Sequence, residues 1–221
     1  MTQTVPQLSV FGEHQVFVAL GTPGDSPSQC LRKQALIWSL AERCRGRSGA
    51  LEIVPGMNNL TLSLEKDQQP SEWLEWLRQV LPSLPGSIPE GKLHRIPVRY
   101  GGDTGPDLAE VARLHQVSEQ DIIRAHCSAE YRVLFMGFLP GFAYLGGLPE
   151  QLHTPRRAEP RLQVAAGSVG IGGSQTGIYP ATAPGGWQLI GHTQVPLFDA
   201  AATEPCLLAP GDRLQFVAGD C

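Results

Sequence analysis

The stretch LQVAAGSVGIGG, residues 162–173, places short apolar runs between glycines and shows no helical period. Runs of about four to eight apolar residues bounded by glycine or proline are typical of β-strands joined by tight turns. Other stretches of the second half share this character: YRVLFMGF (131–138), GWQLIGHT (186–193) and CLLAPGDRLQFVA (206–218). Strands this short and this closely spaced favour a closed β-barrel or a β-sandwich.

The first half of the chain follows a different pattern. After Ser28, a candidate helix cap, apolar residues recur at helical spacing: Leu31, Ala35, Trp38 and Ala41. One short apolar strand is expected within 7–20. Two strands with a bend at Pro55-Gly56 are expected from Leu51 and Ile53 and from the alternating leucines of 60–64, and a second helix after Ser71. This order predicts a small α/β sandwich over residues 1–90. The proline-rich stretch 82–95 has no period and reads as a linker, so a second domain is expected over residues 91–221.

The composition limits the possible partners. With 221 residues, a formal charge of −4 and a pI near 5.9, the chain offers no general attraction for nucleic acid or anionic lipid. Its five cysteines form no C-x-x-C pair and no zinc-type cluster, which predicts free thiols and no protein-held metal. The N-terminal residues lack the basic and apolar regions of a leader, and no run of about 18 apolar residues occurs. We therefore expect a cytoplasmic protein.

Two local patterns have competing interpretations. LAEVARLHQVSEQDIIRAH (108–126) has the rhythm of a DNA-binding helix-turn-helix, with Ser118 and Asp121 in capping-box spacing, but its second helix is nearly neutral. A helical hairpin covering one end of the barrel is the preferred interpretation. GSVGIGG (167–173) could cradle a phosphate, yet it lacks the Walker lysine and a long following helix. A β-bulge or a tight strand corner is preferred there.

The histidines give no metal or nucleophile signal. His126, His153 and His192 occur in no H-x-H or H-E-x-x-H motif, and each is predicted to be a hydrogen-bonded scaffold residue. Ser168 or Ser174 could be combined with them into a catalytic triad, but no G-x-S-x-G elbow supports one.

The densest group of special residues lies between 135 and 193. Glycines and prolines shape FMGFLPGFAYLGG (135–147) and the loops beyond it, and aromatic residues there can wall an apolar pocket: Phe138, Phe142, Tyr144, Tyr179 and Trp187. Arg156, Arg157 and Arg161 could each bind a carboxylate or a phosphoryl group with a forked pair of donors. Composition alone does not separate this pocket from an ordinary aromatic core.

These motifs resemble a known family. G-F-x-P-G-F-x-Y-L (137–145), T-P-R-R (154–157), A-G-S-V-G-I-G-G-x-Q-T-G-x-Y-P (166–180) and P-G-G-W-x-L-I-G-x-T (184–193) are similar to the KipI / allophanate hydrolase subunit 1 family. I-P-V-x-Y-G-G-x-x-G-P-D-L (96–108) fits the start of that family's main domain. M-N-N (57–59) and L-H-T-P-R-R-A-E-P-R-L (152–162) resemble the branch formed by the B-type subunits of 5-oxoprolinase. The resemblance covers nearly the whole chain.

The resemblance implies a small N-terminal α/β domain followed by a cyclophilin-like β-barrel, an α+β, mostly β fold. It further implies a B-type subunit of an ATP-dependent 5-oxoprolinase, which opens 5-oxo-L-proline to L-glutamate together with subunits C and A, with Mg²⁺ accompanying ATP. The B-type and C-type subunits would phosphorylate the lactam. Two alternatives remain: a KipI-like protein that inhibits a histidine kinase by binding alone, and a peptidyl-prolyl isomerase suggested only by barrel shape.

Roles for individual residues follow as hypotheses from residue type and matching motif positions. Position 192 is histidine where many relatives of the family have arginine, so no charged role is assigned to it. The expected catalytic residues are Arg156, Arg161, Ser168, Gln175 and Tyr179. The expected substrate-binding residues are Phe138, Pro140, Phe142, Tyr144, Gly185, Gly186 and Trp187.

Overall fold

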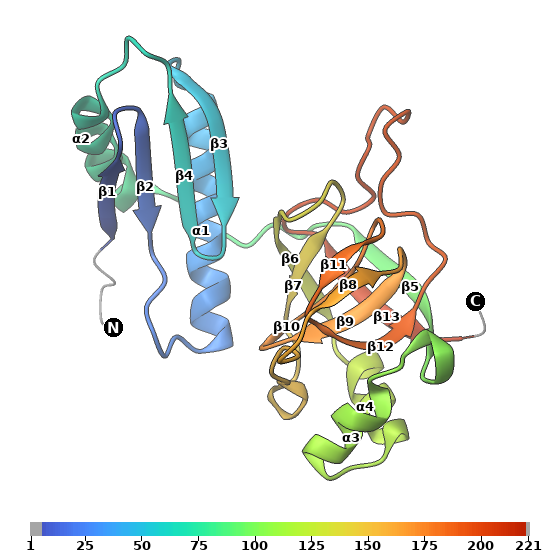
Figure 1. Ribbon diagram of the computed structural model, residues 1–221. Helices are drawn as coiled ribbons and strands as arrows, with labels where there is room; N and C mark the ends of the chain where they lie inside the picture. The colour runs from blue at the N-terminus through green and yellow to red at the C-terminus, as the bar shows by residue number, and fades with distance from the viewer. Residues whose placement is uncertain (1–5, 220–221) are drawn as a thin grey trace. The chain divides into compact units, whose positions relative to one another are not determined.

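The computed structural model describes residues 6–219, and the chain divides between Pro89 and Glu90 into two compact units. Each unit has its own hydrophobic core. The predicted fold class is confirmed: a small α/β sandwich precedes a closed β-barrel, and the whole is mostly β (Figure 1). In the part of the chain that the structure describes, no helix has both the length and the apolar character that a membrane crossing requires.

The N-terminal unit is a four-stranded antiparallel sheet with strand order β1-β2-β4-β3 and two helices. Alternate apolar side chains of the central strands, such as Val16 and Leu62, are fully buried against Leu40 and Trp73 of the helices. The elements are β1 (Gln7–Phe11), β2 (Gln15–Ala19), α1 (Pro27–Arg45), β3 (Ala50–Gly56), β4 (Asn59–Leu64) and α2 (Pro70–Val80). The short apolar strand expected within 7–20 is confirmed as β2. The strand β1 before it was not expected; Gly12, at φ +58°, turns the chain between the two strands into a hairpin.

Both helices of this unit begin at a proline, which corrects the predicted caps. Ser26 caps α1 and forms a capping box with Gln29, so the cap is not Ser28. The second helix begins at Pro70, with Ser71 inside its first turn. Proline has a fixed φ suited to the first helical position and keeps the preceding residue out of the helix, so it sets both boundaries.

The C-terminal unit is a barrel of seven strands in the order β10-β7-β6-β13-β5-β12-β9, with β10 pairing back to β9. Its first and last strands, β5 and β13, pair in parallel, and the other pairs are antiparallel. A separate two-stranded sheet joins β8 and β11. The strands are β5 (Leu93–Tyr100), β6 (Tyr131–Met136), β7 (Ala143–Gly146), β8 (Arg161–Val164), β9 (Ser168–Gly172), β10 (Gln175–Ile178), β11 (Ala183–Gly185), β12 (Gln188–His192) and β13 (Arg213–Ala218).

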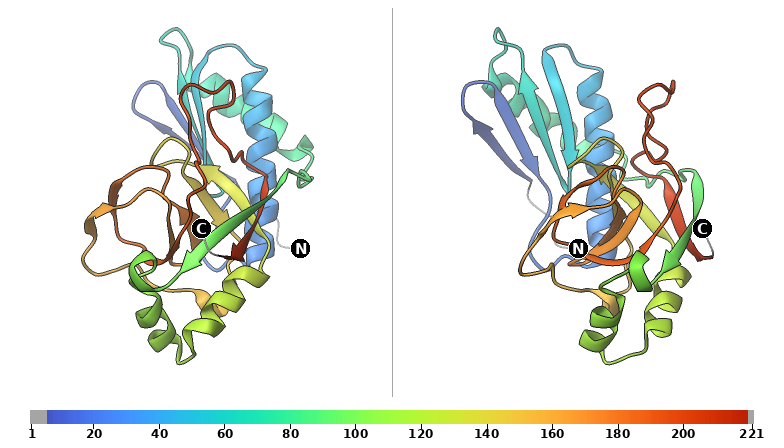
Figure 2. Two further views of the ribbon diagram at one scale, coloured as in Figure 1. Left: turned by 90° about the vertical axis from the view of Figure 1, so that its right-hand side faces the viewer. Right: turned by 45° about the vertical axis from the view of Figure 1, so that its right-hand side comes forward.

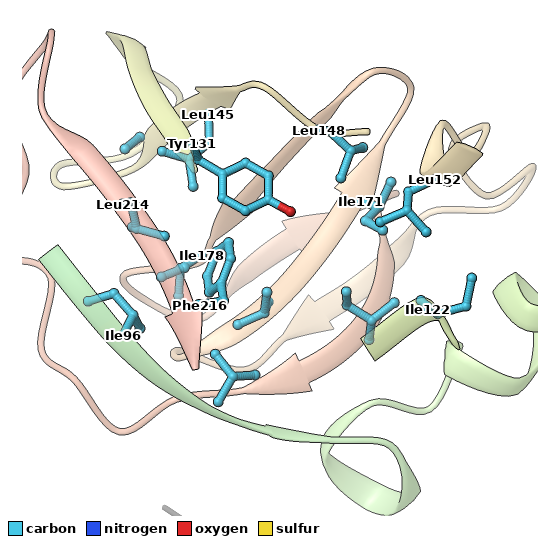
Figure 3. Packing of buried hydrophobic residues seen from close by; sticks show 14 of the residues in the cluster. Ile96, Ile122, Tyr131, Leu145, Leu148, Leu152, Ile171, Ile178, Leu214 and Phe216 are labelled. Atoms are coloured by element: carbon cyan, nitrogen blue, oxygen red, sulfur yellow. The ribbon is translucent and has the colours of Figure 1, made fainter. Parts of the chain in front are cut away.

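The interior of the barrel is filled with side chains. Figure 3 shows the rings of Tyr131 and Phe216 among aliphatic residues from several strands, including Ile96 and Ile178. Each of these residues is almost fully buried. The barrel is therefore a packed core, and any ligand site must lie outside it.

A helical hairpin, α3 (Leu108–His115) and α4 (Glu119–Ser128), lies at one end of the barrel (Figure 2). Leu108, Val111 and Ile122 belong to the barrel's core cluster. Arg113 pairs with Glu110 and Arg124 with Asp121, which leaves the surface without excess positive charge. The hairpin interpretation is thus confirmed, as is the capping box of Ser118 and Asp121.

Candidate active site

A floor of glycines lies beneath two aromatic rings at the hairpin of β9 and β10. A Cβ atom on Gly172 would lie 2.5 Å from Nε1 of Trp187. A Cβ on Gly177 would lie 3.1 Å from the Trp187 ring and 3.2 Å from the Phe142 ring. The glycines are therefore required by ring packing, because any side chain would displace the rings.

The same hairpin decides between the interpretations of GSVGIGG. Strands β9 and β10 pair without a register shift, and Gly173, at φ +66°, makes the turn, so the tight strand corner is confirmed. Of the two preferred alternatives, this run takes the corner; a register shift lies on the neighbouring strand β12, between Leu189 and Gly191. In this conformation Gly172 and Gly177, which have no side chains, allow the rings of Trp187 and Phe142 to pack directly against the backbone.

The aromatic residues predicted to wall a pocket form one cluster around Phe142. Its ring centroid lies 4.9 Å from that of Tyr144, 5.5 Å from those of Tyr179 and Trp187, and 5.4 Å from that of Phe138. Phe142, Tyr179 and Trp187 are buried, so the core interpretation holds for them. Phe138 is 56% exposed and forms the outer edge of the cluster.

The turn that carries Phe138 is strained. Phe138 has φ +66°, a left-handed conformation that is rare for a bulky residue and costs about 1–3 kcal/mol. Hydrogen bonds from Leu139 N to Gly137 O and from Phe142 N to Leu139 O hold the turn, which also exposes Pro140. The backbone thus fixes an aromatic ring at the surface, beside the buried rings.

Asp107 organises two of the three arginines. Its carboxylate accepts hydrogen bonds from both terminal nitrogens of Arg161 (2.9 and 2.8 Å), from Nη1 of Arg157 (3.0 Å) and from the backbone N–H of Leu189 (2.7 Å). The Asp107 residue is only 4% exposed. A buried, charge-assisted network of this kind fixes the side chains that it joins. Asp107 thereby ties β8, β12 and the 154–157 loop to the start of α3.

Arg156 has no such partner. It is exposed, and no described residue forms a hydrogen bond or an ion pair with it. Burial raises the pKa of the Tyr144 and Tyr179 hydroxyls, and the positive charge of Arg156 acts in the opposite direction on both. Arg156 is therefore a free guanidinium beside the aromatic cluster.

A cavity of about 290 Å³ adjoins the aromatic cluster and contains two of the predicted catalytic residues, Arg161 and Ser168. Val164 and Leu189 belong to both the cavity wall and the aromatic cluster. The remaining lining comes from Asp103, Thr104, Pro106, Gln163, Ala165 and His192. The predicted site is thus two adjoining groups, one around the rings and one around the cavity.

The other predicted residues belong to the first group or border it. Tyr179 accepts a hydrogen bond from the backbone N–H of Trp187, and its hydroxyl lies against the backbone of Gly185. Gly186 accepts a hydrogen bond from Arg157 N (2.8 Å). Gln175 pairs with Gly172 across the hairpin, and its Nε2 is buried without a partner among the described residues.

The scaffold role predicted for the three histidines is confirmed. His126 lies between the Tyr100 hydroxyl (2.7 Å) and Thr176 Oγ1 (3.0 Å), and Nε2 of His153 lies 3.2 Å from Leu148 O. Nε2 of His192 lies 2.8 Å from the carbonyl of Ala166. His192 nevertheless also lines the cavity, which the sequence analysis did not foresee.

The profile of the carboxyltransferase domain, subdomain C and D, matches residues 6–208. The chain belongs to this carboxyltransferase C/D family. It is 53% identical to the B-type subunit of 5-oxoprolinase from Escherichia coli O157:H7 over 192 residues, 86% of this chain and 88% of that protein. It is 46% identical to the Haemophilus influenzae protein of the same name, over 86% of this chain and 90% of that one.

Solved structures extend the comparison of this carboxyltransferase C/D chain. TTHA0988 is 32% identical with a TM-score of 0.76, over 94% of this chain, which spans only 40% of that protein. PH0987 of Pyrococcus horikoshii is 36% identical with a TM-score of 0.58, over 97% and 98% of the two chains. The Kluyveromyces lactis urea amidolyase has a TM-score of 0.78 at 20% identity, over 97% of this chain and 15% of that one, and shares the fold.

Proposed function

We propose that the chain is a subunit of an ATP-dependent 5-oxoprolinase. The observation that carries this proposal is the 53% identity to a B-type 5-oxoprolinase subunit over 88% of that protein. The free guanidinium of Arg156, the exposed ring of Phe138 and the cavity beside Arg161 supply groups suited to a small anionic substrate.

The proposed reaction begins by activating a stable amide. The lactam oxygen of 5-oxo-L-proline takes the γ-phosphoryl group of ATP and ADP leaves; water then attacks the activated carbon, the C–N bond breaks, and L-glutamate and phosphate result. In this proposal Arg156, whose charge acts on Tyr179, neutralises charge on the transferred group, and Gln175 and Tyr179 border the same ring cluster. Phe142, Tyr144 and Trp187 give this region an apolar wall.

ATP is proposed to enter with Mg²⁺ bound through its phosphates. Mg²⁺ is usually held by one or two carboxylates together with substrate phosphates. Within residues 6–219, no group of three or more histidine, cysteine or acidic residues is placed to hold a metal by itself. Coordination mainly by the nucleotide suits that arrangement.

The proposed complex contains subunits C and A and acts in the cytoplasm, where ATP is available and thiols stay reduced. The described cysteines, Cys30, Cys44, Cys127 and Cys206, are all unpaired, as predicted; Cys221 lies outside the described residues.

We expect the chain, mixed with its subunits C and A, to release ADP and L-glutamate only when 5-oxo-L-proline and ATP are both present. Coupled ADP release and chromatographic glutamate detection measure the two products, and omission of this chain is the control. Unchanged turnover without the chain would reject the proposal. Inhibition of a histidine kinase without turnover would support the KipI-like alternative.

We also expect Leu162→Asp to weaken association with the C-type subunit at least tenfold. Leu162 is 88% exposed on β8, next to the cavity residues Arg161 and Gln163, and an apolar side chain this exposed beside the site is a candidate contact for a partner subunit. Leu51, 65% exposed on β3 of the N-terminal unit, provides the matched control Leu51→Asp. Sedimentation of each variant with the C-type subunit measures the affinity, and equal losses in both variants would contradict a specific role for Leu162.

A further inference from the structure

The hydroxyl of Ser168 opens onto the cavity. The residue is only 5% exposed, it lines the cavity of about 290 Å³, and no described residue hydrogen-bonds its Oγ. A serine hydroxyl can both donate and accept a hydrogen bond. The Oγ of Ser168 is therefore available to a ligand in the cavity.

The guanidinium group of Arg161 favours a ligand that carries a negative charge. Both of its terminal nitrogens donate to Asp107, while its Nε–H has no partner among the described residues. Arg157 shares the same carboxylate, so two guanidinium groups face a single buried negative charge. The Nε–H of Arg161 at the cavity wall can therefore donate a charge-assisted hydrogen bond to an anionic group of a ligand.

The size of the cavity separates the substrates of the proposed reaction. Pockets that bury drug-sized ligands are about 300–1,000 Å³. At about 290 Å³ the cavity lies just below that range, which suits a single small ring and not a whole nucleotide.

The remaining lining is not uniformly positive. Asp103 and Gln163 are exposed at the cavity and add oxygen acceptors to it. A simple anion such as phosphate has no use for a carboxylate, but a ligand that carries an N–H group as well as a carboxylate can satisfy both kinds of group.

We propose that this cavity binds the small cyclic amide acid, of the chemical class of 5-oxo-L-proline, through its carboxylate at Ser168 and Arg161, and that the nucleotide binds elsewhere. The inference rests on the proposed function and specifies which substrate this part of the site takes. Asp107 is then a positioning residue, because it acts through Arg161.

The test compares Ser168→Ala with Ser174→Ala in the complex with subunits C and A. Ser174 is exposed in the turn between β9 and β10 and does not line the cavity, so the same chemical change there is a matched control. We expect Ser168→Ala to raise the KM for 5-oxo-L-proline about tenfold or more and to leave the KM for ATP within about twofold, because only the first substrate loses a charge-assisted hydrogen bond. Ser174→Ala should change neither constant.

A second variant, Arg161→Lys, and a direct binding measurement test the same assignment independently. Arg161→Lys retains the charge but loses the fork, and should likewise raise the KM for 5-oxo-L-proline alone. Calorimetric titration of the full chain with 5-oxo-L-proline should show binding that Ser168→Ala weakens by a similar factor. A rise in the KM for ATP, or no change in either constant, would overturn the assignment while the proposed function stands. A wild-type complex without 5-oxoprolinase activity would instead remove the proposed function, and the titration would still test the cavity.

Discussion

Acidification from pH 6.5 towards pH 3 should destabilise the barrel through His126. Burial lowers the pKa of this fully buried histidine to about 3, against an ordinary value of 6.5. Thr176 donates to Gly170 O (2.8 Å), so it accepts from His126 Nε2, while Nδ1 accepts from Tyr100. The neutral ring is the form that fits this network. Between the two pKa values the unfolded chain binds a proton that the folded chain does not. The free energy of unfolding therefore decreases as the pH is lowered through this range.

The slope contributed by His126 is up to about 1.4 kcal/mol per pH unit, which totals several kcal/mol over the window. His126→Gln removes the titrating group while keeping a donor and an acceptor. The difference between the free energies of opening of the wild type and the variant, taken at each pH, therefore cancels the contribution of other titrating groups. Amide hydrogen exchange in β9 and β10 at several pH values measures the free energy of opening. Equal pH slopes in the two proteins, or an NMR titration of the His126 ring near pH 6.5 in the folded state, would refute the expectation.

Asp107→Ala should cost the barrel unit about 3–5 kcal/mol, because it leaves the two clamped arginines and the Leu189 N–H without their common acceptor. Asp107→Asn keeps an acceptor for Leu189 and loses the charge, so its cost should be smaller. Activity in the complex should fall in both variants, since Arg161 loses its orientation.

The measurement is hydrogen exchange in β8 and β12, since a two-unit chain need not unfold in one step. Asp103→Ala is the control for stability: Asp103 is exposed, no described residue hydrogen-bonds its side chain, and its loss should cost less than about 0.5 kcal/mol. If Asp107→Ala is no less stable than Asp103→Ala, the clamp has no structural role.

The sequence predicted the kind of fold better than its boundaries. Apolar strands such as YRVLFM and RLQFVA were visible because their own side chains fill the core. Strands β7 (AYLG), β10 (QTGI) and β11 (APG) were not identified, since each is short and rich in glycine or small residues. Their pairing depends on distant partners, which local propensity does not record.

The candidate site was predictable in composition but not in geometry. The density of rings indicated the cluster around Phe142, which the structure contains. Asp107 was not singled out, because its bonds to Arg157 and Arg161 span 50 and 54 residues. The available signal was indirect: Arg156, Arg157 and Arg161 lie close together in the chain, and such a concentration of charge calls for a buried acid nearby. The open hydroxyl of Ser168 depends on tertiary packing and has no local signature.

The parallel pairing of β5 with β13 has a consequence for biosynthesis. Six residue pairs, from Arg213 with Leu93 to Ala218 with Val98, join the first strand of the barrel to the last. A nascent chain on the ribosome can complete its N-terminal sheet early, because all the partners of that sheet lie before residue 65. The barrel cannot close until β13 has left the ribosomal exit tunnel, and until then the apolar residues of its interior stay uncovered.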